Sequence, residues 1–201
     1  IEHKKDGVIL KGFKGLLGTK TPITFEGAKV ILCGGSFGST KMMLQSGFKS
    51  KLPALGKYFA SHPQFMWFGV QKDPVDAHKG GFQSVASKDP NFRKEGFKLE
   101  NVFGPPISVG MLFDVQGRKH LEYMKKYRHL QCIEVAVRDE NIGEISVDKK
   151  GKLIVNKPLT DQDIARKNKG LTAIKNILKA ADAIDVLEAP FYFGLHLMGG
   201  C

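Results

Sequence analysis

The 201-residue sequence is 42% hydrophobic and 25% charged, which is the usage of an ordinary globular domain, and no long apolar run predicts a membrane span. The net charge of +11 comes from lysines and arginines scattered in ones and twos, without the basic run of a nucleic-acid-binding segment, so we expect no nucleic-acid partner. Three cysteines without a Cys-x-x-Cys pair exclude a disulfide scaffold and a four-cysteine zinc site.

The first third of the chain alternates short apolar runs with glycines. Gly7–Leu10 and Pro22–Phe25 are expected to form short strands. Ala28–Cys33 is a continuous apolar and β-branched run, which is typical of a strand covered on both faces. We therefore expect Cys33 to be a small buried hydrophobic residue in that strand.

A glycine-rich turn and a helix follow this run. Gly34–Gly38 is expected to form the turn, and Ser39–Gln45 has the composition of a helix, with Ser39 as its N-cap and Gly47 at its end. Glycines in such a turn let backbone N–H groups approach a phosphate or a ring system, but they equally allow close packing of strand and helix. The G-x-G-x-x-G dinucleotide fingerprint is absent from the sequence, so spacing alone does not separate these two interpretations.

Beyond residue 62 the pattern changes to that of an antiparallel sheet backed by helices on one face. Five segments read as strands: Gln64–Val70, Phe97–Phe103, Leu130–Val137, Glu144–Val147 and Leu153–Val155. A short basic helix is expected at Lys119–Tyr127. The apolar stripe of Asp161–Ala183, capped by Thr160, predicts the longest helix of the chain. The predicted fold class is therefore α+β, with a remnant of an α/β domain at the start.

His196 is the candidate for acid–base chemistry. It lies in His-Leu-Met-Gly-Gly-Cys, where a glycine turn can present the ring at a cleft, and an imidazole exchanges protons near neutral pH. A structural or merely exposed histidine is the simpler alternative. His62 precedes Pro63 and is interpreted as a turn residue. No two histidines have the spacing of a metal site, so we expect no bound metal.

Three segments of the sequence resemble motifs of the glucose–methanol–choline (GMC) family of flavin-dependent oxidoreductases. Ala28–Gly47 is similar to the second signature of that family, with its strand, glycine turn and Met/Leu-rich helix. Leu55–Pro63 is similar to a segment that follows this signature. Leu195–Cys201 resembles the active-site histidine motif, and its nearest branches are the cholesterol oxidases and the long-chain alcohol oxidases.

The resemblance implies an internal fragment of an alcohol oxidase or dehydrogenase that contains FAD. His196 would be the catalytic base that takes the hydroxyl proton of a small-molecule alcohol, and Glu100 would be a second catalytic candidate. The cofactor-binding candidates are Cys33, Gly34, Gly35, Ser36 and Ser39. Residues 1–62 would belong to the FAD-binding domain, residues 63–190 to the substrate-binding domain, and residues 191–201 to a return segment.

Several expectations about the cofactor, partners and location follow. We expect these 201 residues alone to hold no FAD, because they lack the pyrophosphate-binding βαβ unit. A homo-oligomer could re-pair the strand edges of the first 50 residues. The sequence leaves the compartment open, with the cytoplasm favoured. Two rival functions stay open as well, a nicotinamide-dependent α/β oxidoreductase and a non-catalytic basic interaction domain.

Overall fold

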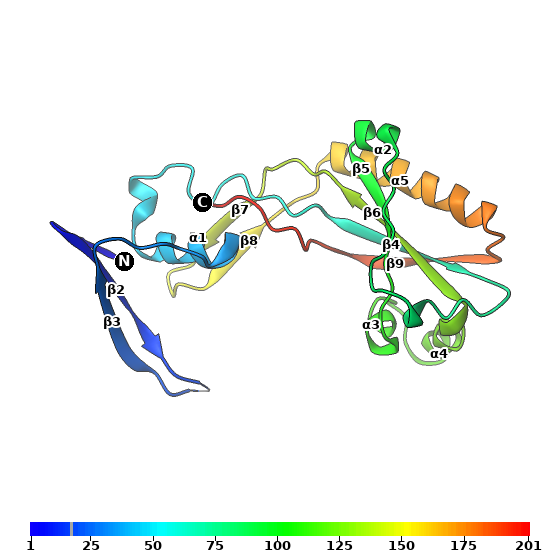
Figure 1. The fold of residues 1–201 in the computed structure, drawn as a ribbon, viewed down its shortest axis with the longest axis horizontal. Coiled ribbons are helices and arrows are strands. Elements are labelled where there is room, and N and C mark those ends of the chain that lie inside the picture. The colour runs from blue at the N-terminus through cyan, green and yellow to red at the C-terminus, as the bar shows by residue number, and fades with distance from the viewer. Residues whose placement is uncertain (17) are drawn as a thin grey trace. The chain divides into compact units, whose positions relative to one another are not determined.

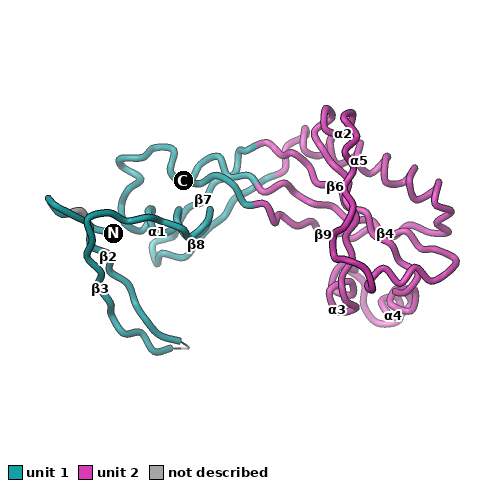
Figure 2. Tube along the Cα trace, viewed as in Figure 1, with its two compact units in different colours: residues 1–60, 141–158, 197–201 teal, residues 61–140, 159–196 magenta. Residues whose placement is uncertain are grey.

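The computed structural model describes residues 1–16 and 18–201. The chain divides into two compact units, which Figure 2 shows in different colours. Unit 1 comprises residues 1–60, 141–158 and 197–201, and unit 2 comprises residues 61–140 and 159–196. Each unit is therefore assembled from segments that are distant in the sequence. The assignment of these parts to a FAD-binding and a substrate-binding domain stays a prediction.

The described residues of unit 1 form two small antiparallel sheets and a helix (Figure 1). The elements of the first sheet, in the order β1-β2-β3, are β1 (Glu2–Lys4), β2 (Gly7–Lys14) and β3 (Thr21–Gly27). Helix α1 (Gly35–Gln45) and the 3-10 turn η1 (Phe48–Ser50) follow. The hairpin of β7 (Glu144–Val147) and β8 (Leu153–Asn156) packs against α1. This hairpin was predicted, but it forms its own sheet instead of extending the large sheet of unit 2.

The prediction of a buried strand at Ala28–Cys33 is wrong. The segment belongs to no helix or strand, and Ile31 is 87% exposed. Cys33 is also exposed rather than buried. Apolar β-branched composition favours an extended backbone, but a strand also needs hydrogen-bonded neighbours. Among the described residues no strand pairs with this segment.

Unit 2 is built on a four-stranded antiparallel sheet in the order β5-β6-β4-β9. Its strands are β4 (Gln64–Val70), β5 (Phe97–Asn101), β6 (Leu130–Val137) and β9 (Asp185–Phe193). Its helices are α2 (Pro90–Glu95), α3 (Pro106–Gly110), α4 (Gly117–Lys125) and α5 (Asp161–Ala180), with 3-10 turns η2 (Ala77–Lys79) and η3 (Tyr127–His129). Strands β4, β5 and β6 follow the predicted segments, whereas β9, α2 and α3 were not predicted.

Both faces of this sheet are covered by helices, so the expectation of helices on one face is wrong (Figure 1). Met66, Phe68 and Val70 of β4 pack on one side with residues of α3 and α4. Phe65 and Trp67 alternate with them and pack on the other side beneath α5. A strand that is apolar at every position buries both of its faces. The α+β class itself is confirmed, with antiparallel sheets backed by helices.

Helix α5 is the longest helix among the described residues and begins where the sequence predicts. Thr160 and Asp163 form a reciprocal capping box, in which the Thr160 side chain accepts from the Asp163 N–H. Ile174 and Leu178 of the predicted stripe are fully buried on the sheet. Gly170 lets the helix approach β6 closely, because a Cβ there would lie 2.3 Å from Val135 Cγ2.

Replacing Gly170 with Ala is expected to lower the free energy of unfolding by about 1–2 kcal/mol, because overpacking against the buried Val135 outweighs the gain in helix propensity. Chemical denaturation measures the change. Asn168→Ala is the matched control, since it adds the same residue at an exposed position of α5 and should leave stability equal or higher. A stabilised Gly170→Ala protein would contradict the close approach of α5 to the sheet.

Candidate functional site

The glycine-rich stretch of unit 1 is the beginning of helix α1 rather than a separate turn. The helix begins at Gly35 with Gly34 as its N-cap, four residues before the predicted start at Ser39. Ser39 therefore is not the N-cap. Its buried Oγ accepts a hydrogen bond of 3.0 Å from the Gly34 N–H and so fixes the bend that leads into the helix.

This helix start fits a polar or anionic group of a cofactor. The first N–H groups of a helix have no partner within the helix and lie at the positive end of its dipole. The first turn of α1 carries no acidic residue that would compensate this charge. Gly35 has φ +63°, and a Cβ at Gly35 or Gly38 would meet no atom within 4 Å, so the surface beside the backbone is open. Cys33 and Gly34 are exposed next to it, and Ser36 is half-buried. Contact of these residues with FAD stays a prediction.

The Gly-Gly pair of the histidine motif has a packing role in unit 1. Gly199 and Gly200 have φ values of +77° and +94°, which favour glycine. A Cβ at Gly199 would lie 2.1 Å from the Tyr58 carbonyl oxygen, and a Cβ at Gly200 would lie 2.7 Å from Thr40 Oγ1. The Gly56 N–H donates to the Gly200 carbonyl. The three segments that resemble GMC motifs, Ala28–Gly47, Leu55–Pro63 and Leu195–Cys201, therefore contact one another in unit 1 through these residues.

In unit 2 the structure places His196 beside His62. The two ring centroids are 5.8 Å apart, and the rings are nearly perpendicular at 88°. His196 follows β9 and is exposed, whereas His62 precedes β4 and is half-buried. His62 was interpreted as a turn residue only. Its position next to His196 makes it a functional candidate that sequence reasoning missed, although it lies in the Leu55–Pro63 segment that resembles the GMC family.

A carboxylate holds His62 in an uncommon backbone conformation. Asp139 accepts hydrogen bonds from the backbone N–H of Ser61 (3.2 Å) and of His62 (3.0 Å), while His62 has φ +46°. A residue with a side chain is strained at such a φ, and strain of this kind is common at functional sites. Burial lowers the pKa of His62 below its usual 6.5; the Asp139 carboxylate opposes this and the neighbouring His196 adds to it. The lowered pKa favours the neutral form of the ring.

Glu100 lies on β5 in a different environment. Its carboxylate forms an ion pair of 2.8 Å with Lys98 and is directly opposite Glu134 of β6. Among the described residues no hydrogen bond or ion pair joins Glu100 to either histidine. Glu134 is 1% exposed, and its Oε1 accepts hydrogen bonds from Gln64 and Gln83. Burial and the Glu100 carboxylate raise the pKa of Glu134 to about 7.

Comparison with known proteins gives two relatives from Mycobacterium tuberculosis. Both are described as uncharacterized GMC-type oxidoreductases, one from strain CDC 1551 / Oshkosh and one from strain H37Rv. Each is 27% identical over 158 residues, which is 79% of this chain and 25% of the relative. This similarity supports the GMC family. The aligned region spans only about a quarter of the relatives' length, and no family model matches the chain.

Two further findings concern the described part of the chain. Within residues 1–16 and 18–201, His, Cys, Asp and Glu side chains form no group of three that could hold a metal ion. None of the helices described there is long and apolar enough to cross a membrane.

Proposed function

We propose that this chain is part of a longer GMC-type enzyme that oxidises the CH–OH group of an alcohol with FAD as the cofactor. The observation that carries the proposal is the exposed His196, in its His-Leu-Met-Gly-Gly-Cys motif, with its ring centroid 5.8 Å from that of His62. The relatives named GMC-type oxidoreductases support the family. The nearest branch would be that of the cholesterol oxidases and long-chain alcohol oxidases.

In this proposal, bound FAD supplies the site that accepts the hydride from the alcohol carbon. The chain's own residues supply position and proton transfer. His196 takes the hydroxyl proton on a ring nitrogen as general base. His62, whose backbone is held by Asp139, orients the His196 ring or the hydroxyl group through its imidazole. The N-terminus of α1, with Gly34, Gly35 and Ser36, would hold polar atoms of the cofactor.

Absorbance spectroscopy of the purified enzyme that carries this chain tests the proposal. We expect a flavin spectrum in the visible range, which bleaches when a primary or secondary alcohol is added without oxygen. A protein that holds no flavin, or that forms reduced nicotinamide from added NAD instead, would overturn the proposal in favour of the nicotinamide alternative. A flavin that no alcohol reduces would overturn the assignment of the substrate class.

Replacing His62 with Ala is expected to lower kcat/KM by about tenfold, because one hydrogen bond or ring contact that orients His196 or the substrate is worth about 1–1.5 kcal/mol. Steady-state kinetics with the best alcohol measures the change. His129→Ala is the matched control. His129 is also half-buried in unit 2, but it precedes Leu130, which pairs with Val70 at the end of β4. His62 lies before Gln64, at the opposite end of β4. Equal effects of both substitutions would contradict the role of His62.

A further inference from the structure

A cleft in unit 2 has His62 and four cationic side chains in its lining. It has a volume of about 800 Å³ and lies between α2, the segment before it, and the start of β5 and end of β6. Its charged lining residues are Lys88, Asp89, Arg93, Lys98 and Arg138. Four of these five side chains are positive. No sequence motif marked any of the four as a candidate site residue.

Most of this positive charge is not compensated by the protein. Lys88, Arg93 and Arg138 form no ion pair with any described residue, and all three are exposed. Lys98 is the exception, because Glu100 pairs with it. The one acidic lining residue, Asp89, uses Oδ1 to accept the Asn91 N–H and so caps helix α2. The remaining cations therefore concentrate positive potential in a concave surface.

Two of these cations lie on backbone that is held by hydrogen bonds. Arg93 lies in α2, which begins at the Asp89 cap and ends at Gly96. Arg138 directly follows β6, and its N–H donates to the Gly96 carbonyl at 2.8 Å. Guanidinium groups on fixed backbone are suited to bind a carboxylate or a phosphate through paired hydrogen bonds. The same cleft includes His62, whose ring contacts His196.

We propose that this cleft binds the anionic group, a carboxylate or a phosphate, of the alcohol whose hydroxyl is presented to the His62–His196 pair. The inference rests on the proposed function for the identity of the reacting group. The binding of the anion rests on the cleft alone. The enzyme would then prefer hydroxy acids or phosphorylated alcohols to neutral alcohols of the same length.

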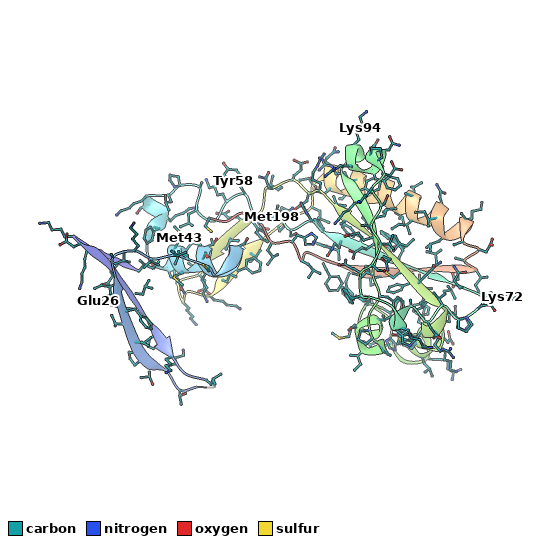
Figure 3. All side chains as sticks on the ribbon, viewed as in Figure 1. Glu26, Met43, Tyr58, Lys72, Lys94 and Met198 are labelled. Carbon is teal, nitrogen blue, oxygen red and sulfur yellow. The ribbon has the colours of Figure 1, made fainter. Side chains whose placement is uncertain are left out.

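Calorimetry with inorganic phosphate and with acetate, at constant ionic strength, tests the anion site in the enzyme that carries this chain. We expect at least one of the two anions to bind, and its Kd to rise by about tenfold or more in the Arg93→Gln/Arg138→Gln double variant. Lys94→Gln is the matched control. Lys94 is on the same helix but does not line the cleft, and its side chain extends outward from α2 (Figure 3). Absence of binding by both anions, or an equal loss in the control, would overturn the proposal.

Kinetics with a short primary alcohol, its ω-carboxylate and its ω-phosphate separate the two sources of the anion. We expect kcat/KM to be about tenfold or more higher for one charged substrate than for the neutral alcohol. The double variant should remove this preference by raising KM while kcat stays within about twofold. If the native enzyme and the double variant both prefer the neutral alcohol, the inferred anion site is wrong, whereas the proposed alcohol oxidation with FAD still stands. A protein without flavin that still binds phosphate through the two arginines would instead overturn the proposed function.

Discussion

Replacing His196 with Ala is expected to lower kcat of the enzyme that carries this chain by about 10²–10⁴-fold, the usual contribution of a general base. The cofactor should stay bound, because the predicted FAD contacts lie at the start of α1 and not at His196. The melting temperature should change little, since the His196 side chain is exposed and its removal leaves no buried cavity. Stopped-flow measurement of flavin reduction gives the rate directly.

The two results for His196→Ala that would contradict the assignment are distinct. Near-normal turnover would show that His196 is not the catalytic base, and Glu100 would become the next residue to test. A loss of activity that follows a loss of folded protein would show a structural histidine. Gly199→Ala is a useful comparison, because a Cβ there would collide with the Tyr58 carbonyl and should lower stability and activity together.

Replacing Glu134 with Gln is expected to remove a pH-dependent loss of stability. The fold raises the pKa of Glu134 from 4.5 to about 7, through burial first and the Glu100 carboxylate second. The folded state therefore favours the protonated carboxyl. The contribution of the Glu134 carboxyl group to the free energy of unfolding is fully present below the unfolded-state pKa of 4.5. This contribution is lost as the pH rises through about 7. From the size of this change we expect a loss of about 2–3 kcal/mol between about pH 5 and pH 8.

Urea denaturation at both pH values measures this effect. A glutamine keeps the Oε1 acceptor for Gln64 and Gln83 without a charge, so the variant should gain stability relative to the native protein as the pH rises. Glu122→Gln on the exposed surface of α4 is the matched control and should leave the pH dependence unchanged. If the free energy of unfolding changes with pH in the same way for the native protein and the Glu134→Gln variant, Glu134 is ionised in the folded protein over this pH range.

The sequence by itself determined the elements whose signal is local. The apolar stripe of α5 and its Thr160 cap predicted that helix from its first residue, and the apolar runs of β4 and β6 predicted those strands with the correct ends. The β7–β8 hairpin followed from the turn at Asp148–Gly151. These signals depend on residue periodicity and turn chemistry, which act over a few positions of the chain.

Only the tertiary structure decided which of these segments meet. Ala28–Cys33 has the composition of a strand but no pairing partner among the described residues, because composition does not specify hydrogen-bonded neighbours. His62 and His196 come together because β4 and β9 pair side by side, and no local pattern encodes that pairing. The raised pKa of Glu134 likewise depends on which residues cover β6. Burial, charge and ring contacts are set by sheet order and register, and these arise from contacts between distant parts of the chain.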